Sequence, residues 1–215
     1  MANKISNLID AIYEKAIQGK NEEQRQILAY FFNKPKVAGG CFESTQYMSD
    51  EEFMDIVERK KQSLNLRQKA IDKIGLDEDQ LSEMPPICFG GFTFKDASCS
   101  KKLKHNVRVS TCYQVSWLFF SSEQFYLYQY TFYLDEDKKK ENTEEYFYSD
   151  VTFLATRTES ETGKDRDGKT FEVEMNSLLV GVPGANFCIS LEDPEKNFED
   201  AIKRMRFKLR EKKNM

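Results

Sequence analysis

Histidine and paired cysteines, the residue types that most often build catalytic and metal sites, are scarce in this sequence. The only histidine, His105, has no serine, cysteine or carboxylate placed beside it in the sequence to make it a catalytic base. The five cysteines are odd in number and include no C-x-x-C pair. Neither a disulfide framework nor a zinc site is therefore indicated, and we expect no metal, no cofactor and no catalytic residues.

Long apolar runs and a strong charge of one sign are also missing. No stretch approaches the roughly 20 apolar residues that a membrane-spanning helix needs. The N-terminus leads into an amphipathic pattern carrying Asp10 and Glu14 instead of an apolar signal core, so we expect a cytoplasmic protein. The net charge of -4 repels nucleic acid and anionic lipid. We expect no nucleic-acid partner, and a membrane partner only through a local basic patch.

Helical periodicity is present from the first residues onward. Apolar residues three and four positions apart predict a helix over 5–17, which Gly19 ends. The pair Asn21 and Gln24 predicts a capping box for a second helix, which Pro35 ends. These two segments predict a helical hairpin.

Two further helices are expected before the diproline Pro85-Pro86. A second capping box at Ser49–Glu52 predicts the start of a third helix, and the pattern over 66–74 predicts a fourth. Neither proline of Pro85-Pro86 can continue a helix or donate a hydrogen bond in a sheet. We therefore divide the chain into a helical region, 1–86, and a β-domain with a C-terminal helix, 87–215.

Beyond the diproline the period of the apolar residues changes to two. The alternation over 113–119, the turn Ser121-Ser122-Glu123 and the segment 124–134 predict a β-hairpin. The segment 135–141 is charged and predicts a loop. Further strands are expected over 146–148, 151–158, 170–180 and 185–191, with Pro183-Gly184 as the last tight turn.

A helix is predicted to close the chain, with Asp193 as its N-cap and Pro194 at its first position. One face of this helix is apolar and is expected to pack on the sheet; it comprises Phe198, Ala201, Ile202, Met205 and Leu209. Phe207 lies about 180° from Phe198 and should therefore face solvent. It is flanked by Arg204, Arg206, Lys208 and Arg210, and we predict that Phe207, Arg204 and Lys208 contact an acidic protein partner.

Antiparallel strands followed by one amphipathic helix are the layout of pleckstrin-homology-like (PH-like) domains, and the segment 125–210 resembles bacterial members of that group. The features that carry the resemblance are Tyr126-Leu127-Tyr128, Tyr146-Phe147-Tyr148-Ser149-Asp150-Val151, Phe171-Glu172-Val173, Phe187-Cys188-Ile189 and the final helix. The phrase from Tyr113 to Phe120, with the order of the whole chain, also resembles a family of uncharacterised bacterial cytoplasmic proteins. These resemblances imply an α+β fold, with a PH-like antiparallel sheet or barrel capped by the C-terminal helix, and no particular activity.

The segment 124–134 is aromatic or apolar on both faces. Phe125, Leu127 and Tyr133 point one way, whereas Tyr126, Tyr128, Tyr130, Phe132 and Leu134 point the other. Because an antiparallel sheet with one wet face alternates polar and apolar residues, a second layer must cover this one. We favour the N-terminal helices as that layer. The alternative is a surface for protein binding or self-association that includes Tyr126, Tyr128 and Tyr130.

The segment Gly163–Thr170 matches the phosphate-binding pattern G-x-x-x-x-G-K-[ST]. Such a loop must lead into a helix, whereas the residues from Thr170 onward alternate as a strand, and Asp165 and Asp167 would repel phosphate. We favour a charged hairpin loop. The alternative is a nucleotide-dependent enzyme that uses Lys169 and Thr170, and the two differ in whether Thr170 begins a helix or a strand.

A basic segment near the start of the β-domain contains Lys101, Lys102, Lys104 and Arg108. In lipid-binding PH-like domains, the loop between the first two strands holds anionic head groups, so the resemblance implies a possible anion site here. A solvated loop is the commoner outcome for such charges, and we favour it. Taken together, the sequence predicts a non-enzymatic binding or scaffold module that acts through protein-protein contacts, with a peripheral anionic-lipid binder as the alternative.

Overall fold

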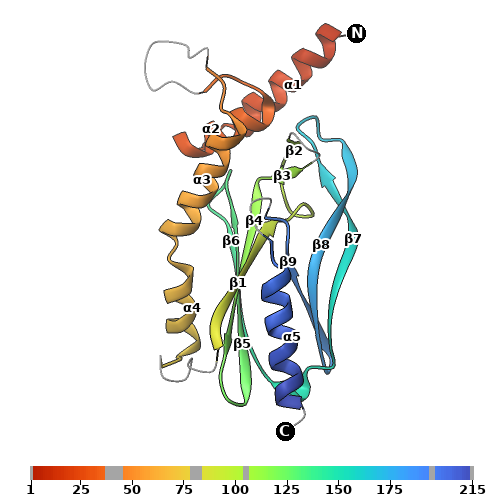
Figure 1. The fold of residues 1–215 in the computed structure, drawn as a ribbon. Helices are drawn as coiled ribbons and strands as arrows, with labels where there is room; N and C mark the ends of the chain where they lie inside the picture. The colour runs from red at the N-terminus through yellow and green to blue at the C-terminus, as the bar shows by residue number, and fades with distance from the viewer. Residues whose placement is uncertain (1, 37–45, 78–83, 104–106, 194–196, 214–215) are drawn as a thin grey trace.

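The computed structural model describes residues 2–36, 46–77, 84–103, 107–193 and 197–213 (Figure 1). Its first half contains the helices α1 (Ala2–Ala16), α2 (Glu22–Phe32), α3 (Asp50–Ser63) and α4 (Leu66–Ile74). These are followed by the strands β1 (Met84–Phe92), β2 (Ser100–Lys102), β3 (Arg108–Ser110), β4 (Cys112–Phe120), β5 (Gln124–Tyr133) and β6 (Lys139–Phe147). The structure is completed by the 3-10 helix η3 (Tyr148–Asp150), strands β7 (Phe153–Lys164), β8 (Thr170–Val182) and β9 (Ala185–Ser190), and helix α5 (Glu199–Lys213).

Both predicted capping boxes are confirmed. The Asn21 side chain accepts a hydrogen bond from the Gln24 amide at 2.9 Å, and the Gln24 side chain accepts one from the Asn21 amide at 3.1 Å. Ser49 and Glu52 make the same reciprocal pair at the start of α3. Because these bonds satisfy amide groups that have no partner within the helix, they set where α2 and α3 begin.

The strands form antiparallel sheets, so the expected α+β class is confirmed. The central sheet has the order β1-β4-β5-β6, a second contains β7-β8-β9, and β2 pairs with β3 alone. The predicted hairpin joins β4 to β5, with Phe120 opposite Phe125. The Pro183-Gly184 turn joins β8 to β9. No closed barrel is present among the described residues.

Several strand assignments differ from the prediction. Strand β1 includes the diproline Pro85-Pro86. Its pairing with β4 shifts register between Met84 and Ile87, because proline has no N–H to donate to the neighbouring strand. The strands β1, β2 and β3 were not predicted. The segment expected to be a charged loop, 135–141, contains the start of β6, whose polar residues suit an edge strand.

The start of the last helix also differs from its prediction. Helix α5 begins at Glu199, and the Asn197 side chain accepts a hydrogen bond from the Glu199 amide at 2.9 Å. Asp193 does not cap it; its carboxylate accepts a hydrogen bond from the Tyr113 hydroxyl at 2.6 Å. The predicted first helical residue, Pro194, lies outside the described residues.

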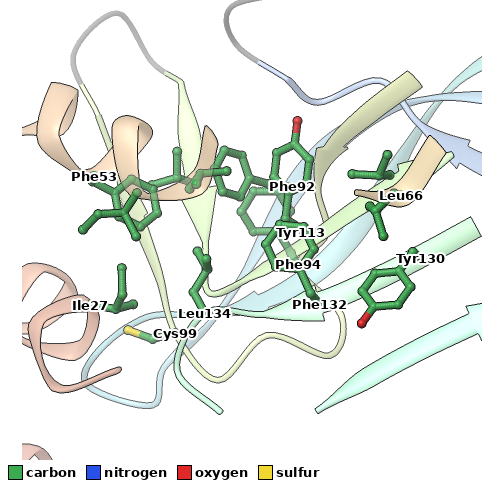
Figure 2. Packing of buried hydrophobic residues seen from close by; sticks show 14 of the residues in the cluster. Ile27, Phe53, Leu66, Phe92, Phe94, Cys99, Tyr113, Tyr130, Phe132 and Leu134 are labelled. Atoms are coloured by element: carbon green, nitrogen blue, oxygen red, sulfur yellow. The ribbon is translucent and has the colours of Figure 1, made fainter. Parts of the chain in front are cut away.

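The central sheet is covered on both faces. On one face, Tyr128 and its neighbours join α1–α4 in a single buried cluster, part of which Figure 2 shows. Phe53 of α3 is fully buried there and stacks on Tyr30 of α2, with 4.5 Å between ring centroids. On the other face, Phe125 and Leu127 pack with β7–β9 and α5. The favoured interpretation, that the N-terminal helices cover one face, is confirmed.

A partly buried charged cluster joins α3 to the segment before α5. The Lys61 ammonium lies 3.6 Å from the Asp193 carboxylate, 5.3 Å from the centre of the Tyr113 ring, and bonds to Glu58. Burial alone would lower the pKa of Lys61, but the neighbouring carboxylates of Glu58 and Asp193 raise it above its usual value. The cluster therefore holds a charged lysine between the helical layer and the central sheet.

Phe53→Ala should lower the free energy of unfolding by about 3–5 kcal/mol, because it empties the contact between α2, α3 and β1. Urea denaturation measures this loss. Leu8→Ala is the control; Leu8 is 60% exposed on α1, and its removal should change stability by no more than about 0.5 kcal/mol. Equal effects of the two substitutions would contradict the shared core.

Lys61→Met should lower the free energy of unfolding by up to about 3 kcal/mol, because Asp193 is 3% exposed and would lose its cation. The double variant Lys61→Met with Asp193→Asn removes both charges and should recover part of that loss. A double-mutant cycle in urea measures the coupling. Additive losses would show that the two side chains do not interact.

Candidate functional site

Phe207 is the most exposed large hydrophobic side chain that the structure describes. It lies on α5 with 72% of its surface exposed, whereas Phe198, Ile202 and Met205 on the opposite side are buried. This confirms the orientation that the helical period predicts. Since an exposed aromatic ring is a common anchor at protein interfaces, its surroundings determine what it can do.

A hollow of about 600 Å³ surrounds Phe207. It is lined by Met84, Lys203, Arg204, Arg206, Phe207 and Arg210, which we call the α5 surface. Lys203 has acidic neighbours, Glu199 at 4.0 Å and Asp200 at 3.5 Å. Within the described part of the chain, no ion pair occupies the guanidinium groups of the three arginines. The α5 surface therefore combines apolar contact area with available hydrogen-bond donors.

The sequence predicted two residues of the α5 surface correctly, placed Lys208 there wrongly and missed Met84. Phe207 and Arg204 lie as expected. Lys208 does not, since it is 5% exposed and its ammonium lies 3.5 Å from Glu211. Position 208 is next to the buried Leu209 and one turn from Met205, so the Lys208 side chain lies along the apolar side of the helix. Met84 was missed, because no local pattern relates β1 to α5.

The three tyrosines proposed for a partner surface are buried. Tyr126, Tyr128 and Tyr130 are 8%, 0% and 5% exposed, beneath the N-terminal helices. The Tyr128 hydroxyl donates a hydrogen bond to Glu141 at 2.8 Å, and burial raises the pKa of Tyr128. These side chains form part of the core and offer very little exposed surface to a partner.

Of the described cations in the basic segment, the structure brings together only Lys102 and Arg108, in a groove that Glu172 and Glu174 also line. The Lys101 ammonium lies 3.9 Å from the centre of the Tyr30 ring and 4.0 Å from Asp50, and burial lowers its pKa. Lys102 and Arg108 are opposite each other in the β2–β3 pair. Because neighbouring strand residues point to opposite faces, Lys101 and Lys102 cannot share one anion. Lys104 lies outside the described residues.

The segment Gly163–Thr170 is a hairpin connection between β7 and β8. Thr170 begins a strand, as the favoured interpretation predicts. The Asp165 carboxylate accepts hydrogen bonds from the amides of Asp167 and Lys169, each at 2.9 Å. Backbone amides that would have to face a phosphate are thus occupied by a negatively charged side chain.

Comparisons with protein-family models, curated proteins and solved structures find no match to this chain. The likeness to PH-like domains therefore stays a prediction. The structure itself defines the class as an α+β protein with antiparallel sheets and a C-terminal helix. In the described ranges, no helix has the length and apolar character needed to cross a membrane. The same residues include no cluster of three metal-ligating side chains.

Lys169→Ala should change neither thermal stability nor any binding of ATP or GTP, because the loop lacks a following helix and its amides bond to Asp165. Isothermal titration calorimetry with each nucleotide measures the binding. Micromolar binding that this substitution abolishes would restore the nucleotide-dependent alternative.

Proposed function

We propose that the protein is a non-enzymatic binding or scaffold module whose α5 surface docks an acidic segment of a protein partner. The observation that carries the proposal is Phe207, 72% exposed in a hollow that it shares with Met84 and three arginines. An aromatic anchor supplies contact energy, and surrounding charges select an acidic partner and speed its approach.

The positions of the arginines support a binding role over a purely structural one. Cations in the last turn stabilise a helix by opposing its dipole, and this accounts for Arg210, Lys212 and Lys213. Arg204 and Arg206 lie before the last turn, where that effect has fallen off. Their planar guanidinium groups suit bidentate bonds to carboxylates, so a partner with aspartate or glutamate beside an apolar residue fits the α5 surface.

Peripheral binding of anionic lipid through 101–108 receives less support. That role needs several cations directed at one head group, and Lys101 is held against Tyr30 and Asp50 instead. The α5 surface has the cations gathered around one hollow. We therefore favour a protein partner over a membrane.

Phe207→Ala should weaken binding of an acidic peptide about tenfold or more while leaving the melting temperature nearly unchanged, because the ring is exposed in the free protein. The probe is a short fluorescent peptide of glutamates interrupted by leucine, followed by fluorescence anisotropy. Added salt should weaken binding, and a peptide with lysine in place of glutamate should not bind.

Leu8→Ala is the matched control, because Leu8 is an exposed apolar residue on α1 outside the α5 surface. It should leave peptide binding unchanged. The proposal fails if Phe207→Ala binds the peptide as well as the unaltered protein does. A large fall in melting temperature would show that Phe207 supports the fold.

A further inference from the structure

Strand β8 extends beyond the strand that pairs with it on one side. Pairing of β9 with β8 ends at Ser177 opposite Ser190, whereas β8 begins seven residues earlier, at Thr170. Figure 1 shows β8 continuing past the end of β9 toward β2 and β3. The first part of β8 is therefore paired with β7 but has a second edge that β9 does not cover.

The backbone groups at this edge point away from β7. The Asn176 carbonyl accepts a hydrogen bond from the Leu191 amide at 3.0 Å, and the Asn176 amide donates to the Glu192 carboxylate. In an antiparallel ladder this direction repeats at every second residue, so Glu174 and Glu172 present their N–H and C=O groups to the same side. No described residue bonds to those groups.

A groove of about 530 Å³ runs along this edge. Glu172, Val173, Glu174 and Asn176 line it from β8. Lys102, Val107 and Arg108 of the β2–β3 region line it as well. A row of successive strand residues beside open space is the geometry in which proteins accept an added strand.

The two faces of the edge have different chemistry. Glu172 and Glu174 are exposed on one face, and hydrogen bonds from Ser160 and Thr162 lower the pKa of the Glu172 carboxyl, which favours its charged form. Phe171 and Val173 alternate with them on the other face and pack against the core on the helix side of the central sheet. The Arg108 guanidinium lies 3.9 Å from the centre of the Phe171 ring on that second face. An added strand would therefore place its side chains alternately beside the two glutamates and beside the partly buried Phe171 and Val173.

We propose that the free edge of β8, from Thr170 to Glu174, binds an extended segment of a partner protein in which basic and apolar residues alternate. The basic residues lie opposite Glu172 and Glu174, and the apolar ones lie opposite Phe171 and Val173, where cross-strand neighbours stabilise each other. A second copy of the same edge does not fit, because glutamates would face glutamates.

The test uses a short fluorescent peptide of alternating lysine and valine and measures fluorescence anisotropy with the full chain. Saturable binding is expected, whereas a peptide of alternating glutamate and valine should bind at least tenfold more weakly. The double variant Glu172→Lys with Glu174→Lys should reverse this preference. Glu145→Lys, which alters an exposed glutamate on the edge strand β6, is the matched control and should leave binding unchanged.

Hydrogen bonding through the main chain is tested separately. Methylating alternate peptide nitrogens, so that no amide on the pairing edge can donate, should abolish binding. Glu174→Pro removes an amide that points into the groove but makes no bond to β7, so it should abolish binding with the fold retained by circular dichroism. If that variant does not fold, the methylated peptide still decides the point.

Two results would overturn the proposal: equal binding of the methylated and unmethylated peptides, or unchanged preference in the double glutamate variant. Either would show that the lysine peptide is held by general attraction to an acidic protein. Phe207→Ala should have no effect on the lysine-valine peptide, because Phe207 lies on the α5 surface and not in this groove. The two proposed sites can therefore fail independently.

Discussion

The constraint on which the rest of the structure depends is that β5 has no polar face. Tyr128 and its neighbours would expose one apolar surface to water and Phe125 and Leu127 another, so the central sheet is stable only between two layers. Helices α1–α4 form one layer, and β7–β9 with α5 form the other. The helical region and the β-rich region consequently share a buried core, although their sequence patterns differ.

Packing the two layers together also brings two segments of the chain, β1 and the segment after β9, into very close contact. A Cβ atom at Gly91 would lie 2.3 Å from the Glu192 amide, so only glycine lets the segment after β9 cross β1 there. This crossing brings Asp193 to Tyr113 and Lys61. Because the pairing of β9 with β8 stops at Ser177, no described strand pairs with the first part of β8 on that side.

The two proposed sites are opposite in charge, and this suits a scaffold. The α5 surface has arginines around Phe207, whereas the edge of β8 has Glu172 and Glu174. The net charge of -4 does not reveal that the two sites differ in sign. A bound partner responds mainly to charges within about one Debye length, roughly 8 Å at physiological salt. The local charge at each site therefore decides which partner approaches and binds there. An acidic segment and a basic extended segment could occupy the two sites without competing for the same side chains.

The sequence alone determined features that depend on residues close together in the chain. The capping boxes at Asn21 and Ser49, the β4–β5 turn and the exposure of Phe207 each follow from local spacing. Alternation after Thr170 likewise distinguished a hairpin from a phosphate loop. Tertiary structure decided the rest, including which layer buries Tyr128, why Lys208 lies on the apolar side, and how Met84 meets α5. Burial and strand pairing depend on distant segments, so no local pattern could show that β9 stops at Ser190 and does not reach the first residues of β8.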